Sequence, residues 1–553
     1  MQRTAILFFI FLFAQNTFGQ TNYFVGTSGQ DASGYGTTTA TPFKTITYAA
    51  NYIVAGDTIN VLGGTYHNPN FGNGSFWNSD EAVYLNNLNG NTSGYITIRP
   101  YQNQSVIFNG NGNYIFQIRN SSFIRIEGFE IAGEVNNIPL DSALKYQFMY
   151  KDAGGNIQYR VPPFTPDSIV DTMTFAVLNN ITRPAYFSTI GLLVQGSNHI
   201  DVINNHIHHT PGTGLRAFQS DYIKFIANEV NDCSRRSSIG NHGFVVENSA
   251  SIDNSDADKI FIEQNKIHHN YNEVYSWSET KTFNTPIIDE GKGISMQKNT
   301  IQGGWVHGRI KIDNNICFLN GFSGIHSNQG VRMEIINNTC YLNSYTGSGN
   351  NIGISLQGSD SISIYNNIVV ADTTWNGFAI SSTDTAHIKV SNNLVQGHLD
   401  TDINTIDANT VFSTPQFVNA STFNFYLQST SAAINAALTS VAPQVDFYNI
   451  TRDNLPDIGA VEFFVQIGIT NVSVTNNILV YPNPFSYQTT ISFSEEQTNS
   501  TIRIIDVLGN EIQKINFTGK ECNIDKGELK AGIYFVNITN NKGNITTTKI
   551  ILQ

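Results

Sequence analysis

Seven similar segments between Gly191 and Gln396 carry side chains capable of acid–base chemistry at equivalent positions. In each segment a glycine opens a short strand with alternating apolar residues, so the residues between the apolar ones are expected to point outward. Cationic and imidazole groups lie at these outward positions, or just before the glycine, on successive segments. Such groups can remove a weakly acidic proton and neutralise a nearby carboxylate. We therefore expect a catalytic set formed by Arg216, His242, Lys292 and His326.

Carboxylates on the same segments could hold a cation. Glu247 lies at an outward position, whereas Asp289 and Glu290 lie just before Gly293. Because Ca²⁺ prefers oxygen ligands, these three residues predict a calcium site. A second interpretation is glycoside hydrolysis, with Glu247 and either Asp289 or Glu290 as the carboxylate pair. A third is that Asp289, Glu290 and Lys292 belong to a solvated loop.

Amide and aromatic side chains occupy other positions around the same strands. Carboxamides both donate and accept hydrogen bonds, and aromatic rings offer flat apolar faces, so both suit sugars. The aromatic residues could equally cover the wall of the fold. We expect a substrate-binding set formed by Phe218, Gln297, Asn328, Gln357 and, within an insertion, Trp277.

An asparagine at the same corner of every segment predicts how the segments stack. Such short strands cannot each bury an apolar face, but stacked about 4.8 Å apart they form continuous parallel sheets with right-handed crossovers. The corner amides can then bond to the coils above and below. The sequence predicts an all-β chain whose main part is a right-handed parallel β-helix, with a ladder of Asn205, Asn228, Asn265, Asn315, Asn338, Asn367 and Asn393.

The longer segments carry their extra residues at one corner. These insertions all precede the glycine that opens the first strand, so they should emerge on one side and line a groove along the first sheet. They lie at residues 134–186, between Cys233 and His242, between Tyr271 and Lys292, and between Asn343 and Ile352.

Three regions are expected along the 553 residues. Residues 1–19 read as a secretory signal peptide, with Arg3 followed by a short apolar core. Residues 20–465 form the β-helix domain, with a capping helix near residues 43–54 and a closing segment from residue 399 that should cap the far end. Residues 471–553 contain short alternating strands and predict a small β-sandwich.

Composition limits the partners and the compartment. A net charge of −13 without a run of basic residues argues against nucleic acid. Beyond the signal peptide no apolar stretch is long enough to span a membrane. Cys317 and Cys340 occupy one column of adjacent coils, and we interpret them as stacked core thiols, with a disulfide as the alternative.

Two family resemblances follow from these motifs. The coil pattern resembles the pectate-lyase-like superfamily of right-handed β-helices, which includes polysaccharide lyases, glycoside hydrolases, uronate epimerases and adhesins. The last region resembles the C-terminal sorting domain of the type IX secretion system of Bacteroidetes. That second resemblance rests on Tyr481, Pro482, Asn483, Pro484, Asp506, Leu508, Gly509 and the run from Ala531 to Tyr534.

The resemblances imply a secreted or surface-attached monomer that meets an extracellular polysaccharide and the type IX secretion machinery. In the superfamily, a lysine base acts with calcium or with an arginine. We expect a lyase that cleaves a uronic-acid-containing chain by β-elimination, with Lys292 or His326 as the base and Arg216 on the carboxylate. The alternatives are a glycoside hydrolase and a non-catalytic glycan-binding surface protein.

Overall fold

The computed structural model divides into two compact units, residues 1–463 and 464–553, which are described separately. Residues 1–19, which are predicted to be a signal peptide, Trp277 and Asp289 lie outside the described residues. The described residues are 20–71, 80–144, 149–151, 157–160, 169–170, 187–237, 240–274, 288, 290–301, 304–344, 352–371, 377–383, 387–400, 407–464, 478–506, 509–527, 529–541 and 545–552.

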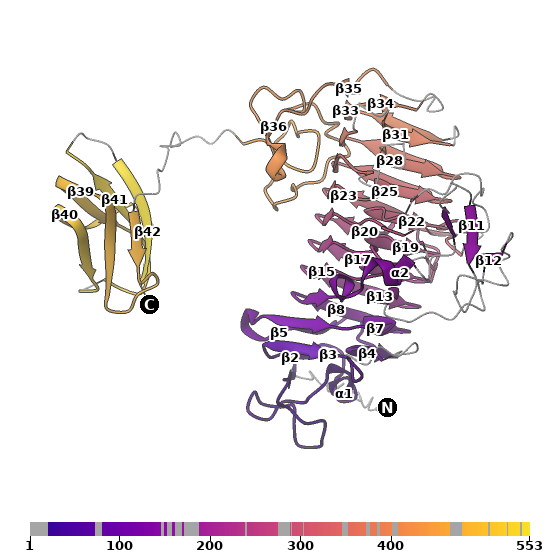
Figure 1. Cartoon of the computed structure of the whole chain (residues 1–553), viewed down its shortest axis with the longest axis horizontal. Helices are drawn as coiled ribbons and strands as arrows, with labels where there is room; N and C mark the ends of the chain where they lie inside the picture. The colour runs from indigo at the N-terminus through magenta and orange to yellow at the C-terminus, as the bar shows by residue number, and fades with distance from the viewer. Residues whose placement is uncertain are drawn as a thin grey trace, which may run out of the picture. The chain divides into compact units, whose positions relative to one another are not determined.

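The first unit is a parallel β-helix, as predicted. Each full coil contributes one strand to each of three parallel sheets, and the coils stack along one axis (Figure 1). The first sheet contains β4 (Val83–Asn86), β7 (Tyr114–Arg119), β13 (Ile190–Gln195), β16 (Leu215–Phe218), β19 (Phe244–Glu247), β22 (Ile294–Gln297), β25 (Ser323–Asn328), β28 (Ile352–Gln357), β31 (Phe378–Ser382) and β34 (His398–Leu399).

The second and third sheets complete each coil. The second contains β1 (Asn22–Val25), β2 (Thr58–Val61), β5 (Ile96–Pro100), β8 (Ser122–Glu127), β14 (Asn198–Ile203), β17 (Asp221–Ile226), β20 (Asp258–Glu263), β23 (Arg309–Asp313), β26 (Val331–Ile336), β29 (Asp360–Tyr365) and β32 (Ile388–Ser391). The third contains β3 (Gly64–His67), β6 (Val106–Asn109), β9 (Glu130–Ala132), β15 (His206–His208), β18 (Glu229–Asn231), β21 (Lys266–His268), β24 (Ile316–Phe318), β27 (Thr339–Tyr341), β30 (Ile368–Val370), β33 (Leu394–Gln396) and β35 (Val411–Phe412).

Alternation along the strands separates the core from the surface. In six of the seven repeats the residue after the opening glycine, such as Leu215 or Ile294, is buried in one continuous apolar core, whereas Phe378 after Gly377 is half-buried. Each fully buried aliphatic side chain contributes about 1.5–3 kcal/mol relative to an exposed one. Register between neighbouring coils is therefore fixed, because a shift of one residue would expose the whole apolar set.

The predicted asparagine ladder is present between the second and third sheets. In a central pair, the Nδ2 of Asn315 donates to the Oδ1 of Asn338 at 2.9 Å, and the backbone N–H of Asn315 donates to the same oxygen. The residue before each ladder position takes a left-handed φ, as at Asn314 (54°) and Asn337 (52°). Asparagine tolerates this conformation better than most residues, which explains the Asn-Asn pairs.

The ends of the stack are covered in different ways. Helix α1 (Ile46–Ala49) packs Ile46 and Ala49 into the core at the amino-terminal end. The closing segment, which includes β36 (Phe417–Asn419), η5 (Ala420–Thr422) and β37 (Asn424–Leu427), instead packs along the third sheet (Figure 1). Phe417 and Phe425 cluster there with outward residues such as Ile368. The expectation that this segment only caps the far end is therefore corrected.

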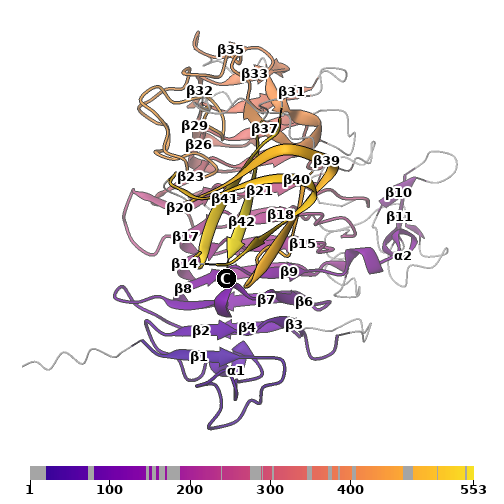
Figure 2. The ribbon, with the colours of Figure 1, turned by 90° about the vertical axis from the view of Figure 1, so that its left-hand side faces the viewer.

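Described parts of two insertions meet at one side of the stack. The turn η2 (Val135–Asn137), helix α2 (Leu140–Leu144) and the antiparallel strands β10 (Met149–Lys151), β11 (Ile157–Arg160) and β12 (Ile169–Val170) project outward there (Figure 2). Ile138 and Ala143 share a buried cluster with Val274, from the corner of a later coil. Arg236 Nε also donates to the Ile138 carbonyl at 3.0 Å.

The second unit is an antiparallel structure of β38 (Ile478–Tyr481), β39 (Gln488–Ile505), β40 (Glu511–Asp525), β41 (Gly532–Thr539) and β42 (Ile545–Leu552). β38 pairs with the first part of β39 and β41 with the last part, while β40 follows β39 along its length. Residues from both parts, including Ile491 and Ile504, enclose one small core, in agreement with the predicted sandwich.

All four cysteines are free thiols. Cys317 and Cys340 pair in register on adjacent coils and are fully buried, which confirms their interpretation as stacked core thiols. Burial raises the pKa of the Cys317 thiol well above its usual value. Among the described residues, no helix is long and apolar enough to cross a membrane.

Removing one rung of the ladder should destabilise the β-helix. Asn338→Ala leaves buried amide and carbonyl groups on the adjacent coils without partners, at a cost of about 1–3 kcal/mol for each unsatisfied group. We expect a clear fall in the thermal unfolding midpoint. The exposed Asn136→Ala is the matched control; equal midpoints for the two variants would contradict a stabilising role for the ladder.

A buried carboxyl group should make the stability depend on pH. Asp313 is 2% exposed, its Oδ1 has no hydrogen-bond partner in the described structure, and burial raises its pKa to about 7 despite Lys311 Nζ at 3.3 Å. The folded protein therefore holds this proton more tightly than the unfolded chain, and the resulting stability is lost as pH rises through 7.

The isosteric Asp313→Asn should remove that dependence. We expect the variant to melt at a higher temperature than the parent protein at pH 8, with the difference shrinking toward pH 5. Because only the difference between the two proteins is used, other titrating groups cancel. A difference that stays constant or grows on acidification would contradict a raised pKa.

Candidate active site

The outer face of the first sheet aligns most of the predicted site in two columns. Strand pairing brings side chains from distant segments into register at each coil. One column contains Leu193, Arg216, Val245, Ser295, His326 and Ser355, and the other contains Gln195, Phe218, Glu247, Gln297, Asn328 and Gln357. Successive members of a column are about 4.8 Å apart, close to the length of one sugar unit.

A buried ionic group lies beside the first column. The Nζ of Lys292 lies 3.0 Å from the Oε2 of Glu290, and the Nε2 of His242 lies 3.5 Å from the same oxygen. These side chains are only 6–13% exposed. They come from the corners that precede β19 and β22, where the insertions end. We call Glu290, Lys292, His242 and His326 the Lys292 cluster.

His326 is the member of the Lys292 cluster that lies on the sheet itself. It is 4% exposed, and its Nδ1 lies 2.7 Å from the Oγ of Ser355 on the next strand. Burial, followed by electrostatic interactions with Lys292 and His242, holds the pKa of His326 well below its usual value, while Glu290 opposes the shift. The imidazole is therefore neutral at physiological pH and can accept a proton.

Phe322 contacts both the ammonium group and the sheet imidazole of the Lys292 cluster. The Lys292 Nζ lies 5.0 Å from the centre of the Phe322 ring, and that ring meets His326 edge-on with centroids 6.2 Å apart. An ammonium over an aromatic face is stabilised electrostatically. Phe322 thus helps to hold both groups in place.

Arg216 and Glu247, predicted to have separate roles, form an ion pair. Glu247 lies on the coil after Arg216 and two residues further along its strand, so the guanidinium reaches the carboxylate directly. The guanidinium also lies 5.4 Å from the centre of the Phe218 ring. Both ionic side chains remain partly exposed, at 30% and 19%.

The three carboxamides predicted to bind substrate, Gln297, Asn328 and Gln357, lie next to one another in the second column. The Nδ2 of Asn328 donates to the Oε1 of Gln297 at 3.0 Å, and Gln297 Nε2 contacts the Oγ of Ser295 at 2.6 Å. Gln357 continues the column and is exposed. Trp277 lies outside the described residues, so its predicted role stays a prediction.

The calcium prediction finds no support in the carboxylates that the structure describes. Glu247 pairs with Arg216, and Glu290 contacts Lys292 and His242. Each carboxylate therefore contacts a nitrogen group and does not belong to a set of converging oxygen ligands among the described residues. No group of three or more His, Cys, Asp or Glu side chains suited to a metal ion occurs in the described part of the chain. With Asp289 outside it, calcium stays a prediction, and no chemical step below depends on it.

Arg119 is a site residue that the sequence reasoning missed. It extends the second column by one coil, because β7 pairs with β13 and sets Arg119 opposite Gln195. Its Nε is buried and has no hydrogen-bond partner in the described structure. The alternation in Tyr114–Arg119 (YIFQIR) matches that of the later first strands, but the insertion at 134–186 separates this coil from the repeats in which the pattern was recognised.

Comparisons with known proteins are consistent with this fold and identify the tail. Residues 479–553 match the secretion system C-terminal sorting domain family. A segment of 84 residues is 37% identical to an endo-acting ulvan lyase of Formosa agariphila, covering 15% of this chain and 16% of that relative. The chain thus spans only a small part of the length of that curated relative.

The chain also has low similarity to two solved structures. The pectate lyase Pel9A is 16% identical, covers 80% of this chain and 97% of its own, and gives a TM-score of 0.45. A rhamnogalacturonan lyase is 13% identical, covers 72% and 91%, and gives 0.38. At these identities the activities of those proteins are not transferred to this chain.

Fold and tail together define an exported parallel β-helix protein. The expectation of a parallel β-helix followed by a type IX sorting domain is confirmed. The sorting domain identifies the chain as secreted or attached to the cell surface, and as cargo of that secretion machinery.

The two ion pairs of the site should differ in their contribution to stability. Glu290→Gln leaves a buried cation without its carboxylate, which typically costs about 3–5 kcal/mol. Glu247→Gln disrupts a more exposed pair and should cost less. We expect a larger fall in the thermal unfolding midpoint for Glu290→Gln; the reverse order would contradict the burial described here.

Proposed function

We propose that the protein is a secreted polysaccharide lyase that cleaves a uronic-acid-containing polysaccharide by β-elimination. The main support is the Lys292 cluster, which sets a neutral imidazole beside a buried ammonium group. β-Elimination next to a uronate requires a base, positive charge close to the carboxylate, and a proton for the leaving oxygen. The cluster offers the first two.

His326 is the proposed base. Its imidazole takes the proton from the sugar carbon next to the carboxylate, and the electron pair left on that carbon forms the new carbon–carbon double bond. The bond to the glycosidic oxygen breaks, and that oxygen takes a proton from solvent. Lys292 is better suited to stabilising the negative charge that develops on the carboxylate, because Glu290 already pairs with its ammonium group.

Cations along the face suit a chain that carries several carboxylates. Arg216 lies one coil before Glu247, and Arg119 lies two coils before Phe218 in the second column. Arg119 makes no ion pair with a carboxylate in the described structure. Its planar guanidinium can hold a substrate carboxylate through two hydrogen bonds. The amides of Gln297, Asn328 and Gln357 suit the hydroxyl groups of the same chain.

Glycoside hydrolysis has less support from this geometry. It needs one carboxyl group as acid and a second as base or nucleophile. The described carboxylates at the site, Glu247 and Glu290, each form an ion pair with a different cation, so neither is held as the partner of the other.

Ultraviolet absorbance of the unsaturated uronate tests the proposed function directly. The chain without residues 1–19 is incubated with ulvan, polygalacturonate, rhamnogalacturonan, alginate and glucuronoxylan, with and without added calcium or a chelator. The proposal expects absorbance to rise with at least one of them. New reducing ends without absorbance would indicate a hydrolase, and the absence of both signals would favour a glycan-binding protein.

Single substitutions should locate the reaction. His326→Ala removes the proposed base and should lower kcat by about 10²–10⁴, and Lys292→Met should give a loss of similar size with the shape of the side chain largely kept. The matched controls are the exposed His387→Ala and Lys298→Met on the same scaffold. Full activity in His326→Ala, with an unchanged melting curve, would exclude His326 as the base.

A further inference from the structure

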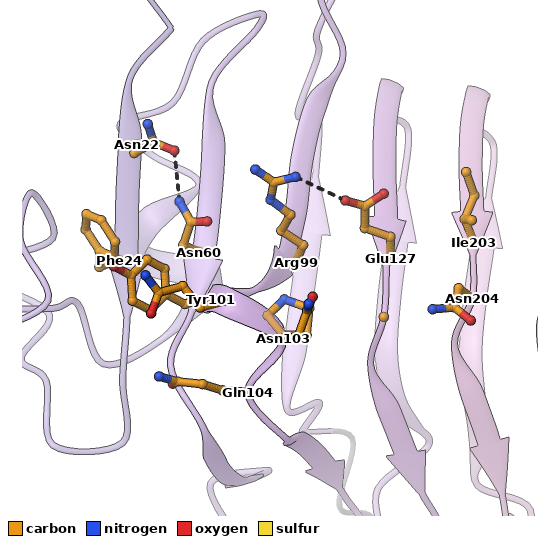
Figure 3. A pocket seen from close by; sticks show the side chains of 13 residues that line it. Asn22, Phe24, Asn60, Arg99, Tyr101, Asn103, Gln104, Glu127, Ile203 and Asn204 are labelled. Atoms are coloured by element: carbon orange, nitrogen blue, oxygen red, sulfur yellow. Dashed lines mark hydrogen bonds and ion pairs between the residues drawn. The ribbon is translucent and has the colours of Figure 1, made fainter. Parts of the chain in front are cut away.

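A groove of about 930 Å³ lies on the second sheet toward its amino-terminal end (Figure 3). Its base crosses neighbouring strands, and one side is formed by the turn η1 (Tyr101–Asn103) that follows β5. Its volume falls within the range of about 300–1,000 Å³ that is usual for small-molecule sites. None of the candidate active-site residues lines it.

The groove carries no net charge. Among the described residues, its only charged lining side chains are Arg99 and Glu127, which point toward each other across adjacent strands with Nη1 and Oε1 3.5 Å apart (Figure 3). Because the pair neutralises itself, the groove does not attract an anionic chain. Both groups remain partly exposed, at 50% and 29%, and so can bind uncharged hydroxyl groups.

Carboxamides supply most of its remaining polar lining. The side chains of Gln102, Asn103 and Asn204 have no hydrogen-bond partner in the part of the chain that the structure describes, although all three are exposed to solvent. Gln102 and Asn103 adopt successive left-handed conformations, with φ of 49° and 57°.

Two aromatic rings form an apolar wall at one end. Phe24 and Tyr101 meet edge to face with centroids 5.5 Å apart, and both are half-buried (Figure 3). A sugar has an apolar face of C–H groups and a rim of hydroxyls. Aromatic rings beside amides and a neutral ion pair match both surfaces.

We propose that this groove binds a neutral oligosaccharide, a short run of linked sugars without acid groups, as a second carbohydrate site distinct from the active site. The inference goes beyond the proposed lyase function, since binding here requires no chemistry on the first sheet. The site would hold the protein on polysaccharides in which neutral stretches accompany the uronates.

Isothermal titration calorimetry tests the site without turnover. The chain without residues 1–19 is titrated with the neutral hexasaccharides xylohexaose, mannohexaose, cellohexaose and galactohexaose, and with a hexamer of galacturonate. We expect at least one neutral ligand to bind at millimolar concentration or tighter in parent protein. Tyr101→Ala and the double variant Gln102→Gly, Asn103→Gly should each weaken that binding tenfold or more. Glycine adopts the left-handed turn readily, so the double variant removes the amides but keeps the backbone.

The control is Tyr426→Ala, which removes an exposed tyrosine that stacks on Tyr448 in the closing segment. It should bind as the parent protein does. The proposal is overturned if no neutral hexasaccharide binds, if binding survives in both groove variants, or if the galacturonate hexamer binds there as tightly. Because calorimetry measures binding and not turnover, a negative lyase assay would not affect this result. A negative titration would likewise leave the proposed lyase function untouched.

Discussion

The regular stacking of the coils depends on hydrogen bonds between asparagine amides at one corner. Along the ladder, one side-chain oxygen accepts hydrogen bonds from both the side-chain amide and the backbone N–H of the preceding ladder asparagine. Asn393 Oδ1 accepts both bonds from Asn367 in this way. Apolar alternation excludes a shift of one residue but not of two, which would keep the apolar set inside, and the ladder excludes that shift as well. That register sets Arg216, His326 and the amides of the second column in lines, although long insertions separate them in sequence.

The same scaffold presents two surfaces with different electrostatics. On the first sheet, burial concentrates charge: Lys292 and His242 surround Glu290 and keep the His326 imidazole neutral. On the second sheet, Arg99 and Glu127 cancel in a solvent-exposed groove. The first arrangement suits proton transfer next to a carboxylate, and the second suits uncharged hydroxyls.

The repeats predicted the architecture because period-two alternation and a corner asparagine leave few other folds. They also predicted which residues share a column, since the strand pairs force it. They could not predict that Arg216 pairs with Glu247, because that contact depends on how far a side chain reaches diagonally across coils. Glu290 lies in a corner whose path the pattern does not specify. The sequence interpretation set the closing segment at the wrong place because apolar residues indicate burial but not which sheet they cover. Arg119 was missed because an insertion separates its coil from the recognised repeats.

The central claim is that this β-helix cleaves a uronate chain by elimination at the Lys292 cluster. Mass spectrometry of the oligosaccharides released from a responsive polysaccharide tests it most directly, because elimination leaves one product end lighter by a molecule of water than hydrolysis does. The account predicts one unsaturated end for every bond cleaved, and almost none from the His326→Ala protein. Cleavage that creates no unsaturated ends, or unsaturated ends undiminished in that variant, would contradict it.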